Sequence, residues 1–297
     1  MSEYHVPVLL HESVEGLAIK PSGTYVDCTF GGGGHSRLIL EKLGSEGRLV
    51  VFDKDEDAKA NAPQDPRLHF MASDFRFIRN YLKFLKITEV DGILADLGVS
   101  SHQFDTPDRG FSIRFEAVPD MRMDKNAPLS ASDVLNGYEQ EELARVLYQY
   151  GELNNSRRVA AALVAKRPIE STSALREALA PFYRKQDEHK FLAVVFQALR
   201  IEVNDELAAL REMLSASQDL LVKGGRLSVI SYHSLEDRLV KNFIRAGNFS
   251  GQPEKDFYGN PLVQMKAVNR QVIIPDEEEI KKNNRARSAK LRIAEKL

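Results

Sequence analysis

The stretch Thr24–Asp53, TYVDCTFGGGGHSRLILEKLGSEGRLVVFD, sets the fold of this chain. A short β-prone run, four glycines and an apolar face at helical spacing predict a strand, a tight loop and a helix in succession. Arg48–Asp53 then predicts a second strand, buried and parallel to the first. This order of elements is the βαβ unit of a doubly wound α/β sheet.

The glycine loop and the acid that follows it indicate a ligand site. Gly31 to Gly34 allow a sharp turn and a close approach of the backbone to a ligand, where any Cβ would collide. Ser36 is expected to cap the helix that follows. Asp53 ends the second strand twenty residues after Gly33, the spacing at which a nucleotide-binding βαβ unit offers a carboxylate to a ribose diol.

The loop favours a nucleoside cofactor over a dinucleotide. A dinucleotide fingerprint requires a third glycine where this chain has Ser36, and His35 crowds the loop. No lysine of a phosphate-binding G-K-[ST] motif follows, so S-adenosylmethionine fits better than NAD. The glycines alone would fit a plain tight turn between strand and helix equally well.

Length and composition restrict the protein class. The chain has 297 residues, 43% of them hydrophobic and 28% charged, which fits one α/β domain with an insertion or two domains. The net charge of −2 means that any polyanion must bind at local patches. The single Cys28 excludes an internal disulfide and favours a cytoplasmic location, and no stretch is long enough to span a membrane. No metal site is expected, because His5 and His11 lack a ligand cluster around them.

Two later strands are expected to deliver site residues to the same sheet edge. His69–Ser73 reads as a third strand, and Phe75 just after it could stack on an adenine or pack in the core. Asp91–Leu97 reads as a fourth strand that brings Asp96 beside the cofactor loop. A carboxylate at that position is difficult to explain as part of the core, so we assign it a function.

The middle of the chain has helical rather than strand patterns and predicts an inserted helical subdomain. The sequence therefore divides into residues 1–103, the first part of an α/β domain, 104–203, a helical insertion, and 204–297, the second part of the α/β domain. The expected helices of the insertion are Ser132–Leu135, Glu139–Gln149, Ser156–Lys166, Ser173–Phe182 and His189–Ile201.

A fifth strand, Gly224–Ser231, is followed by YHSLEDR. Residues adjacent in sequence rarely form a Ser-His-Asp triad, so a hydrolase is not favoured. We expect Ser234 to cap a helix with Asp237 as its capping-box acid. This leaves His233 facing the cleft as a candidate catalytic residue, a second polar group beside Asp96.

The C-terminal segment combines two candidate strands, Val263–Val268 and Ser288–Ala294, with a basic run. Such a run is usually a solvated face. Because these cations are interleaved with Asn and Ser around a strand, a phosphate-contacting edge for RNA is the functional alternative. The cations concerned are Arg285, Arg287, Lys290 and Arg292.

Together, eight motifs across nearly the whole chain resemble the bacterial small-subunit rRNA cytosine-N4-methyltransferase family. The motifs are HVPVLL (5–10), TFGGGGHS (29–36), FDKD (52–55), DLGVSSHQFD (96–105), DMRMD (120–124), FQALRIEVNDEL (196–207), GGRLSVISYHSLEDR (224–238) and RARSAKLR (285–292).

This resemblance implies a class I, Rossmann-like methyltransferase sheet interrupted by an all-helical insertion. It implies S-adenosylmethionine as cofactor, a cytidine in the P-site region of 16S rRNA as substrate, and the small ribosomal subunit as partner, with a homodimer left open. The positions that it implies for cofactor contact are Gly33, Gly34, His35, Asp53, Phe75, Asp96 and Gln103.

Alternatives remain at this point. The chain could methylate another nucleic acid or a small molecule, or it could be a non-catalytic RNA-binding assembly factor on the same fold. The intact glycines, Asp53 and Asp96 favour catalysis, and the run Asp96-Leu97-Gly98-Val99 lacks the [DS]-P-P-[YFW] motif of DNA N4-methyltransferases. Asp96 would either accept a hydrogen bond from the cytosine amine or hold the amino group of the cofactor, and the sequence does not choose between these roles.

Overall fold

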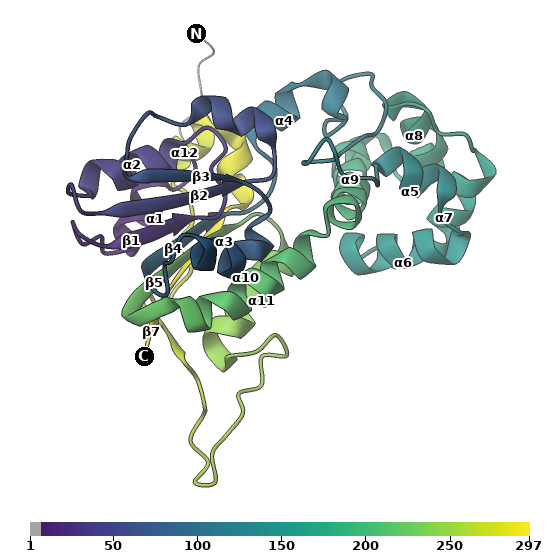
Figure 1. The fold of residues 1–297 in the computed structure, drawn as a ribbon. Helices are drawn as coiled ribbons and strands as arrows, with labels where there is room; N and C mark the ends of the chain where they lie inside the picture. Colours follow the sequence, from purple (N-terminus) through teal and green to yellow (C-terminus); the bar gives the residue numbers. More distant parts are fainter. Residues whose placement is uncertain (1–6) are drawn as a thin grey trace. The chain divides into compact units, whose positions relative to one another are not determined.

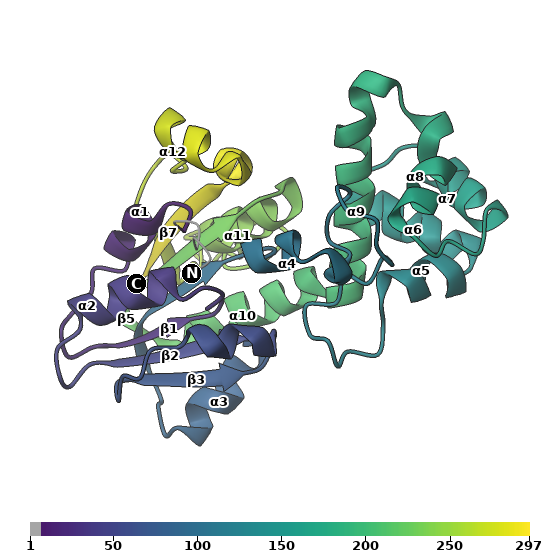
Figure 2. The ribbon, with the colours of Figure 1, turned by 90° about the horizontal axis from the view of Figure 1, so that it is seen from above.

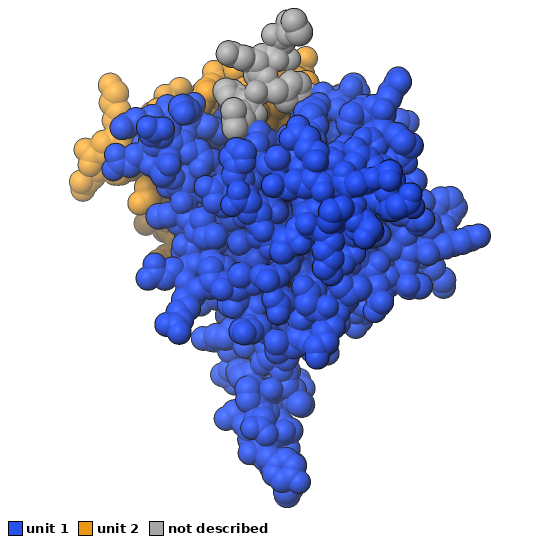
Figure 3. Space-filling view, turned by 90° about the vertical axis from the view of Figure 1, so that its left-hand side faces the viewer, with its two compact units in different colours: residues 1–98, 207–297 blue, residues 99–206 orange. Residues whose placement is uncertain are grey.

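The computed structural model describes residues 7–297, which form two compact units. Within the described residues, unit 1 comprises residues 7–98 and 207–297, and unit 2 comprises residues 99–206 (Figure 3). The boundaries expected from the sequence, at residues 104 and 203, lie a few residues inside unit 2. His5 and the first residues of the HVPVLL motif lie outside the described part of the chain.

Unit 1 contains a seven-stranded sheet in the order β3-β2-β1-β4-β5-β7-β6. The first five strands are parallel, whereas β7 runs antiparallel to both β5 and β6. The order reverses between β1 and β4, the place where open α/β sheets bind ligands. The strands are β1 Thr24–Asp27, β2 Arg48–Asp53, β3 Leu68–Ala72, β4 Val90–Asp96, β5 Leu221–Ser231, β6 Met265–Ala267 and β7 Lys290–Lys296.

Helices cover both faces of this sheet, which confirms the doubly wound class (Figures 1 and 2). Strand β2 shows why, since its residues alternate between two apolar layers. Leu49 and Val51 pack into the cluster beneath α1 and α2. Phe52 points to the other face, where its ring centroid lies 5.7 Å from that of Tyr81 in α3. The helices around the sheet are α1 Leu10–Gly16, α2 Gly34–Lys42, α3 Ile78–Phe84, α10 Glu206–Leu220, α11 Ser234–Ala246 and α12 Glu277–Lys282.

Unit 2 is all-helical and has its own hydrophobic core, as expected for the insertion. Each of its longer helices buries an apolar face, and α6 places Leu143, Val146 and Leu147 in that core. The helices are α4 Ser101–Asp105, α5 Ala131–Gly137, α6 Gln140–Gly151, α7 Ser156–Ala165, α8 Thr172–Leu179 and α9 Glu188–Asn204.

The DMRMD motif forms the turn that leads into this core. Met121 and Met123 are buried in the core, and Arg122 donates hydrogen bonds to the carboxylate of Asp120. The guanidinium of Arg109, itself buried, donates to the carbonyl oxygens of residues 122 and 123, both at 2.9 Å. The motif therefore stabilises the fold of unit 2.

Some expected elements differ in type or extent. The segment Asp55–Ala62, whose sequence predicts a helix that Pro63 stops, forms only a short 3-10 helix. The two last strands are shifted, so that β7 begins at Lys290 and β6 has three residues. The 3-10 helices are Glu56–Asn61, Phe75–Phe77, Pro107–Arg109, Ala180–Phe182, Lys185–Asp187 and Asn284–Ser288. In the described part of the chain, no helix has the length and apolar character needed to cross a bilayer.

The core of unit 2 can be tested at α6. Leu147 is fully buried, whereas its neighbour Tyr148 is 60% exposed. Leu147→Ala removes packed methyl groups and should lower the free energy of unfolding by about 2–5 kcal/mol. Tyr148→Ala is the matched control and should change it by no more than about 0.5 kcal/mol. Urea unfolding followed by circular dichroism measures both, and equal effects would contradict the assigned helix face.

Candidate active site

The carboxyl ends of the parallel strands meet at one edge of the sheet in unit 1. Strands β1, β2 and β4 end in Asp27, Asp53 and Asp96, and β5 is followed directly by Tyr232. Because these strands are neighbours in the sheet, their terminal side chains lie around the glycine loop that follows β1.

The glycine loop makes its turn in the left-handed region and then starts α2. Gly33 is the N-cap of this helix with φ of 76°, and a Cβ there would lie 2.8 Å from the ring of Phe30. A Cβ on Gly34 would lie 2.1 Å from the ring of Pro7. The expectation that Ser36 caps the helix is wrong. Ser36 lies inside the first turn of α2, because the helix begins earlier than expected.

Ser36 instead binds a buried acid, Asp27. The Ser36 hydroxyl donates to Asp27 Oδ2 at 2.6 Å, and the backbone N–H of Thr29 donates to Asp27 Oδ1 at 3.0 Å. Asp27 is completely buried, and this burial raises the pKa of its carboxyl. Asp27 therefore joins the end of β1 to α2 across the loop.

Asp53 is oriented by two backbone donors. Its Oδ2 accepts from the N–H of Gly31 at 2.7 Å, and its Oδ1 accepts from the N–H of Asp55 at 2.8 Å. Burial raises the pKa of the Asp53 carboxyl to about 6 despite these bonds. A carboxylate offers about four acceptor sites, so each oxygen retains one for a further donor, such as a ribose hydroxyl.

Asp96 is held by one hydroxyl donor and one hydroxyl acceptor from two other segments. The hydroxyl of Tyr232 donates to Asp96 Oδ1 at 2.8 Å, and the backbone N–H of Asp96 donates to Thr29 Oγ1 at 2.7 Å. Burial raises the pKa of the Asp96 carboxyl to about 6, although the side chain remains 21% exposed. Burial also raises the pKa of Tyr232 well above its ordinary value of 10, so the phenol stays protonated and keeps donating.

His35 faces Asp96 with a lone pair. Its Nε2 lies 3.3 Å from the carbonyl oxygen of Val8 and its Nδ1 lies 3.9 Å from Asp96 Oδ2. Burial lowers the pKa of His35, so at neutral pH the ring carries one proton, which the Val8 carbonyl assigns to Nε2. Nδ1 and Asp96 Oδ2 are then both acceptors. A donor such as a protonated amine placed between them would satisfy both.

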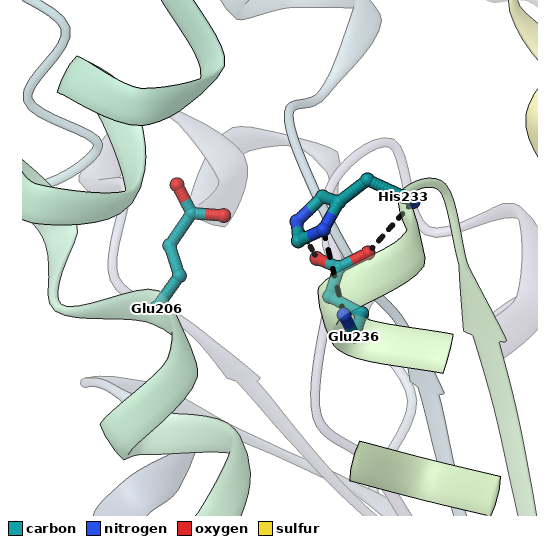
Figure 4. Close-up of side chains that lie close together, drawn as sticks. All are labelled: Glu206, His233 and Glu236. Atoms are coloured by element: carbon teal, nitrogen blue, oxygen red, sulfur yellow. Dashed lines mark hydrogen bonds and ion pairs between the residues drawn. The ribbon is translucent and has the colours of Figure 1, made fainter. Parts of the chain in front are cut away.

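His233 takes the capping position that the sequence analysis wrongly assigned to Ser234. It is itself the N-cap of α11, and the capping-box acid is Glu236 rather than Asp237. Its imidazole, 8% exposed, has Nε2 at 3.1 Å from Glu236 Oε1, a separation of ion-pair length without hydrogen-bond geometry (Figure 4). Glu206, also drawn in Figure 4, belongs to unit 2, where it pairs with Arg200. The ring of His233 is thus directed onto Glu236, and its proposed catalytic role stays a prediction.

Two further expected cofactor residues have different surroundings. Phe75 begins the 3-10 helix after β3 at the same sheet edge and is partly exposed, so its ring is not part of the buried core. Gln103 belongs to unit 2, where its side chain completes the capping box of α4 by accepting from the N–H of Ser100 at 3.1 Å. Their cofactor contacts stay predictions.

The expected RNA-binding cations fall into two groups. Arg285 and Arg287 lie on the 3-10 helix before β7, where Arg287 is exposed. Lys290 and Arg292 lie on β7 and pair with the carboxylate of Asp237, at 3.4 Å and 2.7 Å. Burial raises the pKa of the Asp237 carboxyl, but the two cations lower it by more, so that it lies below its ordinary value. The charges of Lys290 and Arg292 are therefore partly neutralised within the protein.

Sequence reasoning missed Asp27, Tyr232 and Glu236. Asp27 has the same sequence pattern that identified Asp96, since both are acids at the last position of an apolar strand. Tyr232 carried a weaker signal, since it is the first residue after β5 and was overlooked beside His233. Glu236 stands three residues after His233, which is the capping-box spacing once the helix is known to begin one residue earlier.

The residues present fit S-adenosylmethionine. Glycine at positions 33 and 34 lets the loop turn tightly beside Phe30 and Pro7, where a Cβ would clash, and Asp53 offers oriented acceptors twenty residues beyond Gly33. Asp96 and the Nδ1 atom of His35 form an acceptor pair suited to an ammonium group. A sulfonium nucleoside with an amino acid side chain presents a ribose diol and such an amine.

The whole chain also matches known proteins. The model of the MraW methylase family covers residues 2–297. The protein named Ribosomal RNA small subunit methyltransferase H from Bacteroides thetaiotaomicron is 56% identical over 296 residues, which are 99% of this chain and 97% of that protein. Proteins of the same name from Parabacteroides distasonis and Flavobacterium johnsoniae are 57% and 56% identical over 298 residues, covering 99% of this chain and 98% of each relative.

The raised pKa of Asp96 predicts a stabilising substitution at the site. The folded carboxyl keeps its proton up to about pH 6, against an ordinary value of 3.8, so stability falls as pH rises through this window. Asp96→Asn removes that cost and keeps an oxygen for Tyr232. It should raise the free energy of unfolding at pH 8 by up to about 3 kcal/mol, and by less at pH 5.

Urea titrations at the two pH values measure this gain. Glu46→Gln, at an exposed position on the surface, is the control and should show no such pH-dependent gain. A loss of stability in Asp96→Asn at pH 8 would contradict the burial argument.

Proposed function

The chain belongs to the MraW methylase family, and from this membership we propose that it transfers a methyl group from S-adenosylmethionine to the N4 amine of a cytidine in 16S rRNA. The observation that carries the proposal is the arrangement of Asp53, Asp96 and the glycine loop at one sheet edge, in a chain that matches rRNA methyltransferases along its whole length.

The protein binds the cofactor and orients it for transfer. Asp53 accepts hydrogen bonds from the ribose hydroxyls, and its two backbone donors fix the carboxylate in place before the cofactor arrives. Gly33 and Gly34 let the loop lie close to the cofactor. Bound S-adenosylmethionine supplies an electrophilic methyl group on a sulfonium.

On the substrate side, the problem is a weak nucleophile. The lone pair of the cytosine N4 amine is delocalised into the ring, so the amine needs orientation and an acceptor that favours a more tetrahedral nitrogen. Asp96 can be that acceptor, since its carboxylate is ionised above about pH 6 and is held by Tyr232. Transfer forms one N–C bond and breaks one C–S bond, and the nitrogen then releases a proton that an ionised carboxylate can accept.

The RNA must present an unstacked base. Extruding a base costs a few kcal/mol, and less for an unpaired nucleotide, so a cytidine in a single-stranded segment is the favoured target. We place it in the P-site region of the small ribosomal subunit, which makes the cytoplasm the site of action. Unit 2 is our proposed substrate-recognition element, and a homodimer stays a prediction for sedimentation analysis.

The proposed reaction is tested directly by mapping small-subunit rRNA. Mass spectrometry of rRNA from a strain lacking this protein should show one cytidine without its 14-Da methyl increment, restored by the wild-type gene. Restoration by a Gly33→Val variant would contradict the role of the loop, because the branched side chain would clash with Phe30. An unchanged rRNA spectrum, with the loss found on DNA or a small molecule, would favour the other substrate classes.

The two carboxylates can be assigned separate roles. Asp53→Ala should weaken cofactor binding in calorimetry by about 1.5–3 kcal/mol for each charged hydrogen bond lost. Asp96→Asn keeps the shape of the site and should lower the single-turnover rate at saturating cofactor while affinity persists. If affinity collapses instead, Asp96 holds the amino group of the cofactor, together with His35. Unchanged rate and affinity would leave Asp96 a structural residue.

A further inference from the structure

A cavity of about 360 Å³ lies in unit 1 away from the edge that carries Asp53 and Asp96. Residues of α11, β6, β7 and the segment 269–271 line it. Ile244 and Met265, both almost fully buried, form apolar parts of its wall. The reaction proposed above uses none of these residues.

Four cationic side chains line this cavity, and no acidic residue does. Arg292 is paired with Asp237, and Arg245 donates to the carbonyl oxygen of Gly251 at 2.6 Å. Lys241 and Arg270 are exposed, and neither forms an ion pair with a residue in the described part of the chain. The cavity thus presents at least two uncompensated positive charges beside an apolar wall.

An arm, residues 248–264, leaves the sheet between α11 and β6 (Figure 1). The arm is anchored where it leaves α11. The ring of Phe249 stacks on that of Phe243, with their centroids 5.7 Å apart, and the carbonyl oxygen of Phe249 accepts from the side-chain amide of Asn242. Its two sides pair through the N–H of Leu262, which donates to the carbonyl oxygen of Glu254 at 2.7 Å. Arg245 of the cavity also binds this arm, at Gly251.

The tip of the arm displays two aromatic rings. Phe257 is 98% exposed and Tyr258 is 86% exposed, with their ring centroids 5.6 Å apart in an edge-to-face arrangement. The turn that carries them is held by Asp256, whose carboxylate accepts from the N–H groups of Tyr258 and Asn260. Large apolar rings fixed in solvent by a hydrogen-bonded turn indicate a binding surface.

We propose that the cavity and the arm tip form a second RNA-binding surface, with backbone phosphates at Lys241 and Arg270 and unpaired bases stacked on Phe257 and Tyr258. This inference rests on the proposed function, because it takes the substrate to be rRNA. It adds a place where a segment of the same RNA is held outside the methyl-transfer edge.

The chemistry of this surface favours single-stranded RNA. Proteins that hold single strands combine cations along the backbone with aromatic side chains on which bases stack. The net charge of −2 gives the whole molecule no attraction for RNA, so contact depends on local groups of this kind. The cations that the sequence pointed to on β7 are already paired with Asp237, whereas Lys241 and Arg270 are available.

The cation part is tested with the double variant Lys241→Ala/Arg270→Ala. Binding to small-subunit rRNA should weaken about tenfold or more, and the slope of log K against log salt should shrink by roughly 1.4, since each phosphate contact of a single strand contributes about 0.7. The control is Lys42→Ala/Lys83→Ala, which removes the same charge from exposed sites on other helices and should leave the slope unchanged.

The aromatic part is tested with Phe257→Ala/Tyr258→Ala. Loss of base stacking should weaken rRNA binding about tenfold, with an unchanged salt slope. Phe84→Ala, which removes a 79% exposed ring from α3, is the control and should bind as the wild type does.

Cofactor affinity separates this inference from the proposed function. All four variants should bind S-adenosylmethionine as tightly as the wild type, which also shows that they fold. If the wild type neither binds nor methylates rRNA, the proposed function fails. If the wild type methylates rRNA and the surface variants bind it like their controls, the second surface is refuted. Weaker binding to assembled subunits with unchanged binding to free rRNA would make the partner a protein and would also overturn the RNA assignment.

Discussion

The site depends on three carboxylates at the ends of adjacent strands, of which Asp27 is fully buried and Asp53 and Asp96 are partly exposed. All three are held mainly by neutral donors. Hydroxyl and backbone N–H groups hold Asp27 and Asp53, and Tyr232 holds Asp96, with the neutral His35 beyond it. A salt bridge to lysine or arginine would have stabilised each acid but would also have occupied its acceptors. Neutral donors fix the geometry and leave acceptor sites for ligands, and the raised pKa values near 6 at Asp53 and Asp96 are the thermodynamic consequence.

The same constraint explains how the glycine loop is built. The N–H of Gly31 is needed by Asp53, and the hydroxyl of Ser36 is needed by Asp27, so the loop is tied to β2 and to β1 at its two ends. Between these ties the chain must turn with positive φ at Gly33. The loop is therefore a rigid part of the sheet edge, which suits a site whose carboxylates must be oriented before a ligand binds.

The sequence revealed the parts of this design that depend on strand ends. Asp53 and Asp96 could be found because each closes an apolar run, and all parallel strands of a doubly wound sheet end at one edge. Ser36 and Ser234 were assigned wrongly because a cap depends on where a helix begins, and a shift of one to three residues changes the role of every nearby side chain. His233 and Glu236 exchanged roles with Ser234 and Asp237 for this reason alone.

Antiparallel pairing explains why the basic surface could not be predicted. Strand β7 enters the sheet against β5 and carries Arg292 to Asp237 of α11, fifty-five positions earlier in the chain. The same pairing with β6 brings the segment around Arg270 next to Lys241, and these two exposed cations lie outside the RARSAKLR motif, in which Arg287 is exposed as well. A run of cations in the sequence shows only which positions carry positive charge. The tertiary fold decides which of those charges are neutralised internally and which remain for a polyanion, and here it separates Lys290 and Arg292 from Lys241 and Arg270.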